Sequence, residues 1–122
     1  MIGYVCNGTN DLAKAGRFYD ELLAPLGATR SWETERMIGW GTSPDVPGLL
    51  LIMPHDRQPA TIGNGSMVAL AGGSRAGVDA VYNKAIALGA KDEGPLGDRG
   101  GNFYAGYFRD LEGNKLAVYH IG

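Results

Sequence analysis

The sequence predicts an α+β fold made of two similar βαβββ modules in tandem. Two amphipathic helical segments carry this prediction, because each follows one short strand candidate and precedes three more. A second observation is internal similarity, since placing Tyr19 over Tyr82 also superimposes the expected starts of the two helices. We therefore expect a duplicated unit.

The chain of 122 residues has the usual length of one domain, and its 44% hydrophobic and 20% charged residues are ordinary for a globular protein. We expect a single domain over residues 1–122, with module one at about 1–54 and module two at about 65–122. Residues 54–65 contain two prolines and two glycines, which is typical of a connection between modules rather than a disordered linker.

Residues 10–26 are predicted to form the first helix. Its apolar side chains recur three or four apart and so share one helix face: Leu12, Ala15, Tyr19, Leu22, Leu23 and Leu26. Asn10 or Asp11 can cap the start of this helix. Pro25 opposes its continuation, and Gly27 can adopt the positive φ of a helix exit.

The second helix is predicted between Ser74, as its N-cap, and Gly89, as its exit. Its apolar face has the same spacing and consists of Val78, Val81, Tyr82, Ala85 and Ile86.

Strand candidates bounded by turn residues surround both helices. In the first module they are residues 3–7, 28–33, 36–41 and 48–53. In the second module they are residues 67–71, 91–93, 103–109 and 115–120.

The composition argues against several classes of function. A net charge of −2 with scattered Lys and Arg provides no basic surface for a nucleic-acid backbone. No apolar run approaches the ~18 residues of a membrane span, and the first residues do not resemble a signal peptide. Cys6 is the only cysteine, which excludes an intramolecular disulfide and fits a reducing compartment. We expect a cytoplasmic protein without nucleic-acid or membrane partners.

Two motifs near opposite ends of the chain add to the duplicated strand order. The first is Asn10-Asp11-Leu12 before a helix that carries Arg17-Phe18-Tyr19, and the second is Phe108-Arg109-Asp110-Leu111-Glu112-Gly113-Asn114 before the last strand. In the second motif Asp110 is expected to bond the local backbone, with Gly113 in a left-handed conformation. Together these features resemble the vicinal oxygen chelate superfamily of glyoxalases, bleomycin resistance proteins and dioxygenases. The resemblance implies a curved, partly closed mixed sheet around a cavity, with helices outside and often a homodimer.

In metal-using members of this superfamily, the first and fourth strands of each module supply His or Glu ligands. Carried over by register, these positions hold Tyr4, Leu51, Met67 and Ala117 here. A neutral phenol, a thioether and two hydrocarbon side chains do not suit a hard or borderline divalent ion. We therefore expect no metal at these positions and no cofactor.

Side chains on the same strand faces form an apolar and aromatic set, which is the usual lining of a small-ligand site. The expected ligand contacts are Tyr4, Cys6, Leu51, Met67, Phe103, Tyr107, Ala117 and Tyr119. The expected remainder of this face is Leu49, Met53, Ala69, Ala105 and Lys115. An alternative is that all of these residues fill a core. Acid–base roles for Tyr4 or Tyr107 and a nucleophilic role for Cys6 are further alternatives.

Four residues have roles that the sequence leaves open. Trp40 either stacks on the ligand, and so joins the candidate contacts, or lies under a helix. His55 and His120 are either surface residues, proton shuttles or remote metal ligands. Arg99 belongs to the glycine-rich residues 94–102, which are predicted to be a flexible connection between strands and in which Arg99 can clamp an anion.

The first functional hypothesis is a metal-independent protein that binds or sequesters a small, partly aromatic molecule, either between the modules or across a homodimer. A second hypothesis is a divergent glyoxalase, isomerase or dioxygenase with an unusual metal site or with tyrosine acid–base chemistry. A third is a dimeric interaction module without a ligand.

Overall fold

The computed structural model describes residues 1–122 and contains two compact units, Met1–Gly63 and Asn64–Gly122. The division between the units falls inside residues 54–65, where the sequence predicts a connection. Neither helix of the chain is long and apolar enough to cross a membrane.

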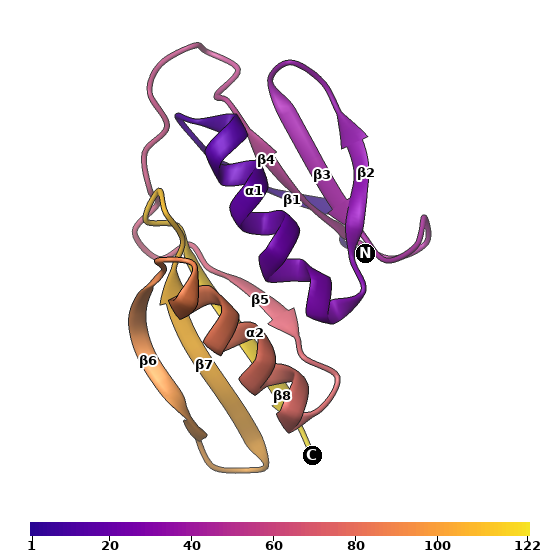
Figure 1. Cartoon of the computed structure of the whole chain (residues 1–122), viewed down its shortest axis with the longest axis vertical. Helices are drawn as coiled ribbons and strands as arrows, with labels where there is room; N and C mark the ends of the chain where they lie inside the picture. Colours follow the sequence, from indigo (N-terminus) through magenta and orange to yellow (C-terminus); the bar gives the residue numbers. More distant parts are fainter. The chain divides into compact units, whose positions relative to one another are not determined.

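Unit one has the predicted βαβββ order, with α1 lying across its sheet (Figure 1). Its elements are β1 (Tyr4–Gly8), α1 (Leu12–Leu23), the 3-10 turn η1 (Ala24–Leu26), β2 (Thr29–Glu33), β3 (Met37–Gly41) and β4 (Gly48–Ile52). The strand order is β1-β4-β3-β2. Strand β1 pairs with β4 in parallel, whereas the other two pairs are antiparallel.

Unit two repeats this topology. Its elements are β5 (Val68–Ala71), α2 (Arg75–Ala87), β6 (Lys91–Asp98), β7 (Phe103–Arg109) and β8 (Lys115–Ile121). The strand order is β5-β8-β7-β6, with a parallel β5–β8 pair and antiparallel pairs elsewhere. Each unit therefore has its own open, four-stranded mixed sheet covered by one helix (Figure 1).

The predicted helix ends are confirmed, and of the two candidates for the first N-cap the structure selects Asp11. Asp11 caps α1, because its Oδ1 accepts a hydrogen bond of 3.1 Å from the N–H of Lys14. Asn10 instead exchanges two hydrogen bonds with the backbone of Ala60. Ser74 caps α2 by accepting from the N–H of Gly77 at 3.0 Å. The two helix exits at Gly27 and Gly89 have φ values of 77° and 100°.

The turn before the last strand also has the predicted geometry. Asp110 is only 6% exposed, and its Oδ1 accepts from the N–H groups of Glu112, Gly113 and Asn114 at 3.0, 3.0 and 2.9 Å. Gly113 has a φ of 100°, which is the left-handed region that glycine tolerates best. One side chain thus satisfies a whole turn of backbone donors.

The prediction that residues 94–102 form a flexible connection is wrong for the first part of this segment. Strand β6 extends to Asp98, and its pairing with β7 continues through Gly94, Gly97 and Asp98. Register shifts occur between Asp92 and Gly94 and between Gly94 and Gly97. Glycine and proline, which usually mark loops, here mark irregularities inside a strand.

The two units share the same packing between helix and sheet. In unit one the ring of Tyr19 on α1 lies 5.6 Å from the ring of Trp40 on β3. In unit two the ring of Tyr82 on α2 lies 6.5 Å from that of Phe108 on β7. The sequence similarity around the two tyrosines therefore reflects a common core contact.

Candidate functional site

The first sheet has one face against α1 and one face away from it. Trp40 lies on the α1 face, because its indole N–H bonds to Asp20 of that helix. Strand pairing then places Leu49, opposite Trp40, and Leu51, opposite Ile38, on the same face. Leu49 and Leu51 are 6% and 0% exposed.

The prediction that Leu51, Leu49 and Met53 share a face with Tyr4 and Cys6 is therefore wrong. Cys6 pairs with Leu50, and Tyr4 pairs with Gly48, so these residues occupy the face away from α1. Tyr4 is 65% exposed, in contrast to the fully buried Leu51. Trp40 likewise lies under the helix and not on the candidate ligand face.

The second sheet places its candidate residues as predicted. Residues on β7 that face α2 are identified by Tyr104, which donates a hydrogen bond to Asp79, and by Phe108, which packs on Tyr82. The alternating residues of β7 and their partners on β8 and β5 lie on the other face: Phe103, Ala105, Tyr107, Lys115, Ala117, Tyr119 and Ala69. Met67 precedes β5 by one residue and is 45% exposed. A ligand role for these residues stays a prediction.

This face carries two aromatic contacts. The rings of Phe103 and Tyr119 are stacked, with centroids 5.5 Å apart and planes 9° apart. The ring of Tyr107 contacts two cations, the guanidinium of Arg99 at 5.4 Å and the ammonium of Lys115 at 5.7 Å. The sequence predicts Lys115 on this face but gives no signal that Arg99 lies beside Tyr107.

The strand register shows which residue of unit one corresponds to Ala117 of unit two. Ala117 pairs with Ala69, whose counterpart in unit one is Cys6, and Cys6 pairs with Leu50. The counterpart of Ala117 is therefore Leu50 rather than Leu51. Neither leucine has a donor atom, so the chemistry of the set is unchanged. Nowhere in the chain do three or more His, Cys, Asp or Glu side chains gather closely enough to hold a metal ion.

The two histidines occupy different surroundings. His55 is exposed in the turn after β4, whereas His120 is partly buried on β8 opposite Tyr104. Each belongs to a different unit. Their proposed proton-transfer and metal roles stay predictions.

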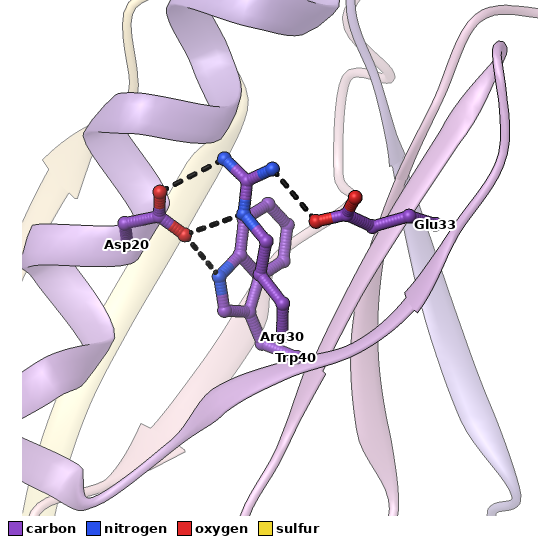
Figure 2. Close-up of polar contacts among 4 residues, drawn as sticks. All are labelled: Asp20, Arg30, Glu33 and Trp40. Carbon is purple, nitrogen blue, oxygen red and sulfur yellow. Dashed lines mark hydrogen bonds and ion pairs between the residues drawn. The ribbon is translucent and has the colours of Figure 1, made fainter.

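A polar network on unit one was not predicted from the sequence (Figure 2). The guanidinium of Arg30 on β2 donates two hydrogen bonds of 2.8 Å to Asp20 on α1 and one of 2.9 Å to Glu33. The indole N–H of Trp40 donates to the same Asp20 at 2.9 Å. The hydrogen bond from Arg30, and secondarily that from Trp40, lowers the pKa of Asp20 below its usual value. The network fastens α1 to two strands and fixes the orientation of Trp40.

Unit two has two comparable contacts between α2 and its sheet. Tyr82 on α2 donates a 2.7 Å hydrogen bond to Asp92 on β6, and Tyr104 on β7 donates to Asp79 on α2. Burial and the contact with Asp92 raise the pKa of Tyr82 to about 12. The contact with Asp79, together with desolvation, raises the pKa of Tyr104. Both phenols are thus held in the protonated form, which suits hydrogen-bond donors and not bases.

Comparison with known proteins agrees with this architecture. The model of the Glyoxalase/Bleomycin resistance protein/Dioxygenase superfamily matches residues 1–118. The chain therefore belongs to this superfamily, as the motifs and the duplicated βαβββ order predict.

Several solved structures are similar to the whole chain. A glyoxalase/bleomycin resistance protein from Albidiferax ferrireducens T118 is 36% identical, with 98% of each chain covered and a TM-score of 0.89. A family enzyme from Burkholderia phytofirmans PsJN is 17% identical over 98% of each chain, with a TM-score of 0.77. A lactoylglutathione lyase from Agrobacterium tumefaciens is 20% identical, with coverage of 98% of this chain and 92% of that one and a TM-score of 0.72. The last two similarities concern the fold alone. No protein with a curated description matches the chain significantly.

Proposed function

We propose that this chain binds a small, partly aromatic molecule on the sheet faces turned away from its helices, and that it does so without a divalent metal ion. One observation carries the proposal. The positions that the family resemblance assigns to metal ligands are Tyr4, Met67 and Ala117, together with Leu50 as the counterpart of Ala117 in the strand pairing, and none of these side chains is an imidazole or a carboxylate.

The chemistry of these four side chains does not fit a Lewis-acid centre. Divalent zinc, iron, nickel and manganese prefer imidazole, carboxylate or thiolate ligands. A protonated phenol and a thioether are weak donors for such ions, and Leu50 and Ala117 offer no donor. We therefore derive no metal-dependent step for this protein.

Met67 and three aromatic residues of the second sheet support binding of an apolar or aromatic molecule. Met67 is flexible and polarisable, and the aromatic rings of Phe103, Tyr107 and Tyr119 offer flat contact surfaces on the same sheet face. Hydroxyl groups and two cations at the edge of this surface provide the few polar contacts that orient a small ligand.

Thermal unfolding in the presence of a library of neutral, cationic and anionic aromatic compounds tests this proposal. A ligand that binds only the folded chain stabilises it by about 2.7 kcal/mol at a hundredfold excess over Kd. Titration of tryptophan emission is a second measurement, in which Trp32 is the reporter because its side chain is 59% exposed. Elemental analysis of protein purified without chelators completes the test. A stoichiometric divalent metal, or no stabilising compound in the library, would contradict the proposal.

A further inference from the structure

An asparagine followed by glycine occurs twice in the chain, at Asn7-Gly8 and at Asn64-Gly65. In this pair the backbone nitrogen of the glycine can attack the side-chain amide of the asparagine, because glycine has no Cβ to obstruct the approach. The attack requires a main chain that can rotate, so it is faster in an open turn than in a paired strand, which must first open locally. The two pairs lie in these two different environments.

The second pair forms a turn in the connection between the two units. Residues 61–67 are all exposed and belong to no helix or strand. Neither the side chain of Asn64 nor the N–H of Gly65 has a hydrogen-bond partner in the chain. Gly65 has a φ of 95°, and a Cβ built there would meet no atom within 4 Å. The attacking nitrogen is therefore unpaired, and nothing packs against the glycine.

The first pair has the same two residues but is held in place. Asn7 lies in β1, where it is in register with Leu51 of β4, and its Nδ2 donates to the hydroxyl of Tyr19 at 3.5 Å. A Cβ at Gly8 would lie only 3.1 Å from the side chain of Ala60. Strand β1 would have to leave β4 before the nitrogen of Gly8 could turn towards the amide of Asn7.

The other asparagines lack the glycine that favours this reaction. Each precedes a residue with a side chain, which hinders the approach of the backbone nitrogen: Asn10, Asn83, Asn102 and Asn114. Asn83 also lies inside α2, where the backbone is helical. Sequence and structure together thus single out one asparagine of the chain.

We propose that Asn64 is a site of spontaneous deamidation, independent of the proposed ligand-binding function. The nitrogen of Gly65 forms a bond to Cγ of Asn64 while the bond from Cγ to Nδ2 breaks. The proton of the Gly65 amide leaves with this nitrogen as ammonia, and a cyclic imide remains. Water then opens the imide at either carbonyl, which gives aspartate or isoaspartate.

The reaction changes the connection in two ways. Both products carry a new carboxylate, so the chain becomes one unit more negative than its net charge of −2. The isoaspartyl product also adds a methylene to the main chain, within the residues that join the two units.

Incubation of the folded chain at mildly alkaline pH, followed by peptide mapping with mass spectrometry, tests the proposal. The peptide with Asn64 should gain the mass change of NH2 replaced by OH and separate into two products. Conversion at Asn64 should be at least about tenfold faster than at Asn7, because reaction at Asn7 first requires local opening of β1. In concentrated urea the two sites should react at similar rates, since their dipeptides are the same.

Two variants assign the new charge. Asn64→Gln should abolish the more acidic species that ion exchange detects, because the longer side chain closes a larger ring and reacts more slowly. Asn83→Gln alters an exposed amide on α2 and is the matched control, in which the acidic species should form as in the parent chain.

Three results would overturn the proposal. The first is equal conversion of Asn7 and Asn64 in the folded chain, which would remove the role of the structure. The second is an intact Asn64 in the folded chain after the time that converts it in urea, which would show that the turn prevents attack. The third is an acidic species that persists in Asn64→Gln, which would place the modification elsewhere.

Discussion

The indole N–H of Trp40 donates a 2.9 Å hydrogen bond to Oδ1 of Asp20, and this bond ties strand β3 to helix α1. Trp40 is 1% exposed, so its N–H has no access to bulk water as an alternative partner. Arg30 bonds both oxygens of the same carboxylate. Asp20 is therefore the shared acceptor on which the packing of this helix depends.

Asp20→Ala should destabilise the folded chain by about 1 to 3 kcal/mol, because it leaves the buried indole N–H of Trp40 without an acceptor. Urea unfolding followed by tryptophan fluorescence measures this change. Glu21→Ala removes the neighbouring exposed carboxylate and is the control, for which we expect a change within about 0.5 kcal/mol. Similar losses in both variants would show that the Trp40 contact adds nothing.

The lowered pKa of Asp20 also predicts that the stability of the folded chain falls at acidic pH. The pKa of this carboxyl is lower in the folded chain, so the unfolded chain binds its proton at a higher pH. The stability contributed by the carboxylate is complete above the unfolded pKa and is lost as the pH falls through the folded pKa. The parent chain should therefore lose more stability than Asp20→Asn on acidification, as measured by urea unfolding at several pH values. Parallel pH profiles would exclude this linkage.

The raised pKa of Tyr82 predicts that the stability of the folded chain falls at alkaline pH. Burial first, and the contact with Asp92 second, raise the pKa of Tyr82 from 10.0 to about 12 in the folded chain. The unfolded chain then loses this proton more readily, so the contribution to stability is complete below about pH 10 and falls as the pH rises towards 12. Tyr82→Phe should show a flatter stability profile in this range and a loss of about 1 kcal/mol at neutral pH. Asp92→Asn should retain part of the slope, because burial of Tyr82 remains. A profile for Tyr82→Phe as steep as that of the parent chain would assign the alkaline loss to other groups.

The stability of the folded chain should depend strongly on the side chain of Asp110 in the turn before β8. Asp110→Ala removes the acceptor of three backbone N–H groups and should lower the free energy of unfolding by about 2 to 3 kcal/mol. Asp110→Asn keeps one carbonyl oxygen and should lose less. The urea midpoints of the two variants give this order, and a reversed order would contradict the role of Oδ1.

The sequence predicted the order of elements because local signals were strong. The capping residues Asp11 and Ser74 and the exits at Gly27 and Gly89 act over a few residues, and the structure confirms all four. The turn at Asp110 was predictable for the same reason. These features depend on hydrogen bonds within one turn and need no knowledge of the rest of the chain.

The facing of β4 was not predictable because the strand is apolar on both sides. In the run Gly48–Ile52 every side chain is hydrophobic or absent, so no alternation distinguishes Leu50 from Leu51. Only the pairing with Cys6 and with Ile38 settles it. The network of Asp20 and Arg30 was missed for a related reason, since its members come from separate elements and follow no spacing rule.

The strand residue that bonds to the helix has opposite charge in the two units. It is the cation Arg30 in unit one and the carboxylate Asp92 in unit two. Arg30 and Asp92 occupy the same place after their helices, opposite Trp40 and Phe108 respectively. Arg30 needs an acidic helix partner, whereas Asp92 needs a hydroxyl donor. A recombinant that exchanged α1 and α2 would deprive Arg30 and the indole of Trp40 of the carboxylate of Asp20, and would leave Arg30 with Glu33 as its acidic partner. Two units of the same topology thus hold their helices by different contacts, so that one helix cannot substitute for the other without loss of hydrogen bonds.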